Sequence, residues 1–400
     1  MTQTILTPTA VTRKALMILH NKLFLAKKVD RQYDATYKDS GAVTNSKFGP
    51  QLKVRLPNQY TVRTGKTIDV QDTAETSVTI DVSTQKGVDT VFSTAELTLS
   101  MDDFAERILE PGMARLAGEI ENSGFALYSD IYNSVGTAGT TPSTMLVALQ
   151  AGQKLDENLA PRDRKRFLAV NPAAMAGMVD GYKGLFQSSE AIKNQYETGL
   201  VTDPATGFVW GSSAVVNSHT NSAGVVTSIT VNDSAIAEGA TDVTVNTTTT
   251  AYSTGTIVTF AGCYAVNPET KNRYSHLQQF VVQSGTTATN LVIQPAIYTT
   301  GALQNVSAVP TDSGAVTVVG SADGVYPQNM AFHKSAFALV TADLEDVSKF
   351  GAWGAREEHD GISLRIARQY DINSDNIPCR IDVLYGWKTL RAALACRIPG

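Results

Sequence analysis

The chain has 400 residues, of which 42% are hydrophobic and 18% charged, and its formal net charge is −5 at pH 7. This length predicts at least two compact units, and the acidic balance argues against tight nucleic-acid binding, which needs a concentrated basic surface. No apolar run is as long as a membrane span requires and the N-terminus lacks a signal-peptide pattern, so we expect a soluble protein without membrane contact.

An amphipathic helix is predicted for residues 9–29. Apolar side chains recur at helical spacing from Val11 to Ala26. The opposite face carries the most basic local patch of the chain, namely Arg13, Lys14, Lys22, Lys27 and Lys28. A solvated helix face is the simpler interpretation of this patch, and contact with an acidic partner or with DNA is the alternative.

Extended strands are predicted between Phe48 and Leu99, because apolar and polar residues alternate there. Pro57, Gly65 and Gly87 interrupt the pattern. Such a ribbon has one apolar face, and two strands alone are marginally stable, so we expect a neighbouring subunit to cover it. The charged residues expected at this inter-subunit contact are Arg55, Arg63, Lys66, Asp69 and Asp72.

A long helix is predicted after this ribbon. The run Ser100–Asp103 resembles a capping box that opens a short helix. Pro111 is expected to restart the helix, because proline fits best in a first helical turn. The apolar series from Met113 to Ile131 then predicts a helix ending near Asn133, about 35 Å long.

An α/β unit is predicted next. A helix is expected over 143–158, a strand over Arg166–Val170 and a second helix over Ala173–Tyr182. Asn171 and Pro172 separate the strand from the helix that follows, and this order is typical of an α/β unit.

The sequence changes character between about Asn221 and Ala322, where charged residues almost vanish and threonine and valine dominate. More ordinary sequence continues on either side. We therefore predict a small β-barrel or sandwich inserted into a host domain.

The C-terminal segment is predicted to be rich in strands. Residues 329–340 are expected to form a strand that runs into a short helix. Alternating patterns over 362–370, 379–385 and 391–398 predict strands of one long sheet beside the long helix. The fold class expected for the host is therefore α+β.

No catalytic, metal or cofactor signature is present, so we expect a non-enzymatic protein without a cofactor. The run Thr64–Thr67 resembles the end of a phosphate-binding loop, but Tyr60 stands where that loop needs glycine. The five histidines are scattered, without metal-ligand spacing. The three cysteines lack CxxC spacing and are predicted to be buried free thiols.

Four runs, in their order along the chain, resemble the major capsid (coat) proteins of tailed bacteriophages, specifically the podovirus type with an inserted domain. These runs are Phe167–Pro172, Gly207–Ser212, Gly255–Phe280 and Ala331–Phe337. The resemblance implies the Hong Kong 97-like fold. The divisions it implies are 1–47 as N-terminal arm, 48–98 as extended loop, 99–140 as peripheral domain with spine helix, 141–221 as the first part of the apical domain, 222–322 as inserted β-domain, and 323–400 as the rest of the apical domain with the peripheral-domain strands.

The same resemblance implies a structural protein that self-assembles through hexamers and pentamers into an icosahedral shell around double-stranded DNA. Implied partners are a scaffolding protein, a portal protein, packaged DNA held by weak non-specific contact, and a decoration protein as a further candidate. The protein would be assembled in the host cytoplasm and reside in the virion. The basic patch of 9–29 is the candidate contact with scaffold or DNA. Lys66 lies near the loop tip without an evident crosslinking partner, so we expect a non-covalent shell.

Other functions remain open at this point. A cellular nanocompartment shell of the encapsulin-like kind would share the fold and enclose cargo enzymes. A surface adhesion protein with an immunoglobulin-like module would explain the β-rich segment but not the long helix or the ribbon. A hydrolase with an unrecognised site is the weakest alternative.

Overall fold

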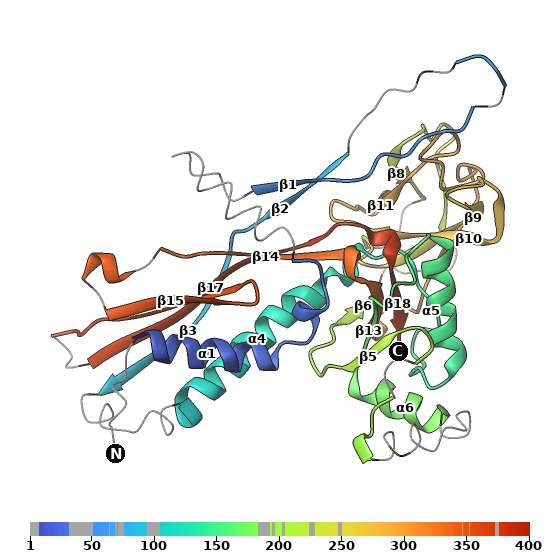
Figure 1. Ribbon diagram of the computed structural model, residues 1–400. Coiled ribbons are helices and arrows are strands. Elements are labelled where there is room, and N and C mark those ends of the chain that lie inside the picture. Colours follow the sequence, from blue (N-terminus) through green and yellow to red (C-terminus); the bar gives the residue numbers. More distant parts are fainter. Residues whose placement is uncertain are drawn as a thin grey trace. The chain divides into compact units, whose positions relative to one another are not determined.

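A computed structural model describes most of the chain (Figure 1). The described residues are 8–31, 51–63, 65–68, 70, 76–93, 105–182, 193, 197–201, 205–223, 229–246, 250–345, 347–351, 353–372 and 376–400. The contacts divide the chain into two compact units. Unit 1 comprises Met1–Val54, Ser77–Gly124 and Phe337–Lys388, and unit 2 comprises Arg55–Thr76, Phe125–Ala336 and Thr389–Gly400.

The first helix of unit 1 is α1, Pro8–Lys22, and a short 3₁₀ turn, η1, follows at Leu25–Lys27. The predicted apolar face is buried, and α1 packs on the strands β15 and β16 described below. The helix ends earlier than the predicted residue 29. The reason is that the backbone N–H groups of residues 24–26 donate to the side chain of Glu121 instead of continuing the helical pattern.

The main sheet of unit 1 has the order β14-β17-β16-β15, and β3 also pairs with β17. Its strands are β3 Thr84–Ser93, β14 Phe337–Ala342, β15 Trp353–His359, β16 Ile362–Arg368 and β17 Asn376–Thr389, with the 3₁₀ turn η6 at Val347–Phe350. The predicted strands at 362–370 and 379–385 are confirmed as neighbours in this sheet. The strand β3 was predicted as part of the covering ribbon, but it pairs antiparallel with β17 along its whole length.

The long helix α4 spans Glu110–Phe125 and follows a π-helical turn, η3, at Ala105–Leu109. Pro111 lies in its first turn, as predicted. The predicted end near Asn133 is wrong, because a 3₁₀ turn, η4, replaces the α-helix over Ala126–Asp130. Within unit 1, α4 packs on β17, where the indole N–H of Trp387 donates to the carbonyl of Ile120 at 3.1 Å. The predicted capping box at 100–103 lies outside the described residues.

Two short strands, β1 Gln51–Arg55 and β2 Ser77–Asp81, form a separate two-stranded sheet. Between them, residues 56–63, 65–68 and 70 adopt no strand conformation. The predicted long ribbon is therefore wrong over these residues. An alternating sequence pattern indicates one apolar face, but it does not supply a backbone partner for a strand.

The sheet of unit 2 that includes the C-terminus has the order β18-β13-β4-β5, with β6 also paired to β13. Its elements are β4 Arg166–Val170, β5 Val209–Ser212, β6 Ser218–Thr220, β13 Val325–His333 and β18 Ala395–Pro399, with α5 Met145–Glu157, α6 Pro172–Tyr182 and the 3₁₀ turns η5 Lys334–Ala336 and η7 Ala392–Leu394. β4 and β5 are parallel, which confirms the predicted α/β unit. The amide oxygen of Asn171 accepts the N–H of Ala174 at 2.8 Å and caps α6.

The strand β18 corrects one expectation. It was predicted to join the strands at 362–370 and 379–385, but it pairs antiparallel with β13 instead. All five of its residues are buried. An alternating sequence pattern predicts that a segment is a strand. It does not predict which strand lies beside it, because pairing partners are set by tertiary contacts.

The segment rich in threonine and valine forms a six-stranded antiparallel barrel with the order β7-β12-β9-β10-β11-β8. The strands are β7 Ile229–Thr230, β8 Ala240–Thr244, β9 Ile257–Val266, β10 Arg273–Val282, β11 Asn290–Ile297 and β12 Ala315–Val318. A bridge between Val231 and Val245 closes it. The barrel has its own apolar core, in which the rings of Phe260 and Phe280 lie 5.4 Å apart. The chain enters and leaves it through the paired strands β6 and β13.

Candidate interaction surfaces and buried polar sites

The segment between β1 and β2 exposes large apolar side chains. We call its described residues, 56–63, 65–68 and 70, the exposed loop. Val62 is 96% exposed, Val70 87%, Ile68 76% and Tyr60 60%. A cluster of large apolar side chains at such exposure is typical of a surface that another molecule covers.

The charged residues predicted for inter-subunit contact lie in and beside this loop. Arg55, Arg63 and Lys66 are exposed, as expected for a contact surface. The guanidinium of Arg63 donates to the carbonyls of Gly65 and, at 3.0 Å, of Thr67, so this side chain also shapes the loop tip. Asp69 and Asp72 lie outside the described residues.

The basic patch on α1 and the turn after it is partly neutralised within unit 1. Arg13 Nε lies 3.2 Å from Glu357 Oε2, and Lys22 Nζ lies 3.4 Å from Glu110 Oε1. Burial lowers the pKa of Lys27, which is half-buried like Lys28, whereas Lys14 is exposed. The five residues do not form one uniform basic stripe, because Arg13 and Lys22 each pair with a carboxylate.

A buried carboxylate on α4 holds the turn after α1. Glu121 is 3% exposed and accepts three backbone N–H groups, from Phe24 at 3.1 Å, Leu25 at 2.8 Å and Ala26 at 3.0 Å. Burial raises the pKa of Glu121, and the three donors oppose that rise. The sequence analysis missed this residue. Its position four residues after Ala117, on the apolar face of the helix, was the available signal.

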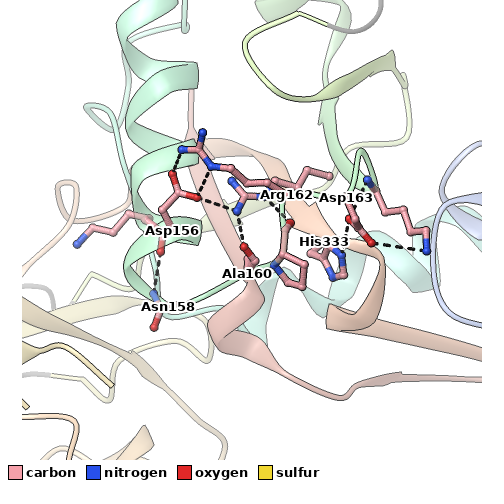
Figure 2. A network of polar contacts seen from close by, with 10 residues as sticks. Asp156, Asn158, Ala160, Arg162, Asp163 and His333 are labelled. Carbon is pink, nitrogen blue, oxygen red and sulfur yellow. Dashed lines mark hydrogen bonds and ion pairs between the residues drawn. The ribbon is translucent and has the colours of Figure 1, made fainter. Parts of the chain in front are cut away.

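A second polar network lies at the C-terminal end of α5 (Figure 2). Asp156 accepts hydrogen bonds from Arg162 Nε at 3.0 Å and from Arg166 Nη2 at 2.7 Å. These guanidinium groups, with Arg162 first, hold the pKa of Asp156 below its usual range. Nearby, His333 Nε2 lies 3.1 Å from Asp163 Oδ1. Asp156, Arg162 and Arg166 also line a cavity of about 670 Å³. A carboxylate bound by two arginines is a structural ion pair rather than a proton acceptor.

A chain of hydroxyl and imidazole groups joins the barrel to β6 within unit 2. Ser253 Oγ donates to the carbonyl of Thr220 at 2.9 Å and lies 3.1 Å from Thr256 Oγ1. Because a carbonyl only accepts, Thr256 must donate to Ser253. His219 Nε2, 3.2 Å from Thr256 Oγ1, therefore carries the imidazole proton. Its Nδ1 accepts from the hydroxyl of Tyr128 at 3.3 Å.

Burial beside a cationic arginine favours the neutral form of His219, in which Nδ1 is the acceptor. Burial, followed by the nearby charge of Arg397, lowers the pKa of His219 from 6.5 to about 4. The unfolded chain takes up this proton near pH 6.5 and the folded chain only near pH 4, so stability falls as the pH drops through that window. We expect a loss on the order of 2 kcal/mol between about pH 7 and about pH 4.

The measurement is urea unfolding of the wild-type subunit and the His219→Gln variant across this pH range. The variant should lose this part of the pH dependence, because its amide does not titrate. An identical pH dependence in both proteins would contradict the assignment of a neutral, buried His219.

The remaining candidates are the cysteines, possible metal sites and possible membrane spans. Cys263, Cys379 and Cys396 are buried free thiols, which confirms the prediction. Among the described residues, no group of three His, Cys, Asp or Glu side chains is placed to hold a metal ion. Within the same residues, we find no helix with the length and apolar character of a membrane span.

Comparison with solved structures shows which fold the chain has. A structure from Mycobacterium phage Che8 matches with a TM-score of 0.50 at 12% identity, covering 94% of this chain and 90% of that chain. The asymmetric unit of the bacteriophage PhiM1 mature capsid matches with a TM-score of 0.42 at 12% identity, covering 88% and 82%. A virus-like particle from Pyrococcus furiosus matches with a TM-score of 0.40 at 7% identity, covering 98% of each chain. The fold is the Hong Kong 97-like fold of phage capsid proteins.

The family follows from the sequence model of the P22 coat protein, gene protein 5, which matches residues 3–398. The chain belongs to this family. No curated protein matches the chain significantly. The protein is therefore a structural coat protein whose copies build the multimeric shell of a phage virion. This membership implies a structural role, which favours a phage coat over the adhesion protein, the hydrolase and the nanocompartment shell.

Proposed function

We propose that copies of this protein join through hexamers and pentamers into an icosahedral shell around the double-stranded DNA of a tailed phage. The observation that supports this arrangement is the exposed loop, whose apolar side chains Val62, Ile68 and Val70 are at least three-quarters exposed. In the shell each loop lies on a neighbouring copy, which removes these side chains from water. Arg55, Arg63, Lys66, Asp69 and Asp72 then lie at or near that contact.

The proposed domain divisions are those implied by the family resemblance, from the N-terminal arm at 1–47 to the closing segment at 323–400. The inserted domain at 222–322 is supported by the separate core of the barrel and by the pairing of β6 with β13 at its base. Asn221 N donates to Gly324 O at 3.0 Å at the same place. An insertion is easily accommodated where the entering and leaving strands are neighbours.

The proposed partners are a scaffolding protein during assembly, a portal protein and a decoration protein. Packaged DNA is held only by weak non-specific contact, because the chain carries net charge −5 and Arg13 and Lys22 are already paired with carboxylates. The candidates for contact with scaffold or DNA are then Lys14 on α1 and Lys27 and Lys28 in the turn after it. Assembly takes place in the host cytoplasm, and the protein acts without catalysis or covalent crosslinks.

Electron microscopy of the protein co-expressed with its scaffolding protein tests this proposal. We expect closed icosahedral shells with fivefold and sixfold capsomers. Boiled shells should run as monomers on a denaturing gel, because the contacts are non-covalent. Monodisperse small oligomers under every salt and scaffold condition would overturn the proposal, and a ladder of boiled multimers would overturn its non-covalent part.

A further inference from the structure

The cavity of about 670 Å³ beside α5 has an apolar wall. The lining residues come from α5, from the loop before β4 and from the start of β5, all within unit 2. Phe208 is buried in the wall, whereas Leu149 is 45% exposed, so the cavity opens to solvent. Leu146, one helical turn earlier on the same face of α5, is also exposed. Exposed leucines beside a cavity of this size are typical of a surface that binds another molecule.

The opposite side of the cavity is basic. The guanidinium groups of Arg162, Arg164 and Arg166 line it. Arg162 and Arg166 share a single carboxylate, that of Asp156. Arg164 is exposed, and it takes part in no ion pair among the described residues. Three cations therefore share one anion on this side.

The other charges near the cavity do not remove this excess. Glu157, the second lining carboxylate, already lies 3.4 Å from Lys154 Nζ and 3.4 Å from His276 Nε2. In the turn before β4, Asp163 Oδ2 lies 3.6 Å from Lys165 Nζ, and Asp163 Oδ1 accepts the backbone N–H of Lys165 at 3.1 Å. The cavity keeps an excess of positive charge that a carboxylate from outside can balance.

We propose that this cavity receives an acidic side chain from a second copy of the chain, with an apolar neighbour that covers Leu149. The inference rests on the proposed function, in which copies meet in hexamers and pentamers. Charge complementarity favours a second copy, because the chain has net charge −5 and its barrel segment 222–322 is acidic. The acidic residues of that segment are Asp233, Glu238, Asp242, Glu269 and Asp312, and its basic residues are Lys271 and Arg273.

A molecule with surfaces of opposite charge can join head to tail, and such heterologous contacts close into rings. DNA is a poorer occupant of this cavity. The lining carboxylates of Asp156 and Glu157 repel phosphates, and the wall formed by Leu149 and Phe208 gives a phosphate no partner.

The test replaces Arg164 with glutamate and measures closed shells by gradient sedimentation and electron microscopy after co-expression with the scaffolding protein. Arg164→Glu should fold, because the side chain is exposed, and its yield of shells should fall at least about tenfold, because like charges then meet at each contact. Lys165→Glu is the matched control. It changes the net charge equally, but Lys165 does not line the cavity, so the yield should stay within about twofold of wild type.

Urea unfolding confirms that both variants fold. Normal shells from Arg164→Glu would overturn this inference and leave the proposed function standing. Failure of the wild-type protein to form shells would overturn both.

Crosslinking of assembled shells provides a readout that does not depend on lost assembly. Arg164→Lys keeps the charge and supplies an amine that a carbodiimide joins to a carboxylate in contact with it. Shells built from equal parts of unlabelled and nitrogen-15-labelled protein distinguish links between copies from links within one copy by mass spectrometry. We expect mixed-label pairs that join this amine to an acidic residue of another copy. Links only within one chain, links only to the scaffolding protein, or no links would overturn the proposal.

Discussion

Replacing Glu121 with alanine is expected to destabilise unit 1 by about 3–5 kcal/mol, because three backbone N–H groups then lose their acceptor in a buried setting. Leu25 and Ala26 are 1% and 0% exposed, so water does not replace the carboxylate without opening the turn. The surroundings leave little room for adjustment. A Cβ atom on Gly124, one turn further along α4, would lie 2.8 Å from both Leu25 and Trp387.

The matched control for this experiment is Glu119→Ala on the same helix. Glu119 Oε2 lies 3.6 Å from Lys86 Nζ, with the Glu119 side chain 40% exposed. Exposed ion pairs of this kind contribute at most about 1 kcal/mol to the free energy of unfolding. Urea unfolding of the purified subunit measures both variants. If Glu121→Ala loses no more stability than Glu119→Ala, the three hydrogen bonds do not hold the turn.

Much of the element order could be predicted from sequence periodicity. The strand Arg166–Val170 was placed at its observed bounds, and α6 begins within one residue of its prediction. This junction could be predicted from two residues. The side chain of Asn171 caps the helix, and the ring of Pro172 fits the first helical turn. The β-rich segment was predicted from its composition, which is poor in charge, but the sequence left a barrel and a sandwich as alternatives.

Other features depend on contacts that a single sequence does not display. The helix predicted over 9–29 ends at Lys22. The reason is that the Glu121 carboxylate, almost a hundred positions further along the chain, accepts hydrogen bonds from the backbone N–H groups that follow. β3 and β18 were recognised as extended segments, but their partners are set by tertiary pairing. The alternating pattern of the exposed loop was read as strand pairing, although its described residues belong to no strand and the side chains of Val62, Ile68 and Val70 face water.

The candidate functional residues also divide into those that could be predicted from the sequence and those that could not. Exposed charges such as Arg55 and Lys66 were predictable, because they alternate with apolar positions. Glu121, His219 and Arg397 were missed, because their importance comes from burial beside groups distant in sequence. Burial of a polar side chain becomes visible only in the folded chain, and there it identifies the sites where a single substitution has a large effect.

The exposed loop yields the prediction with the largest effect on assembly. The double variant Val62→Asp, Val70→Asp should fold normally, with unfolding within about 0.5 kcal/mol of wild type, because both side chains are almost fully exposed in the subunit. Its yield of closed shells should fall at least about tenfold, since burying an unpaired carboxylate at each contact costs more than one such contact supplies.

The control variant, Val62→Thr with Val70→Thr, keeps the branched shape of both side chains without adding charge. It should assemble at a yield much closer to wild type, because a hydroxyl can find a hydrogen bond at the edge of a contact. Gradient sedimentation and electron microscopy measure the yield, and urea unfolding confirms that each subunit folds. Normal shells from a folded aspartate variant would show that the loop remains in water after assembly. The contact between copies would then have to use another surface. Loss of shells with a folded subunit, together with assembly of the threonine variant, would place these two side chains inside an interface.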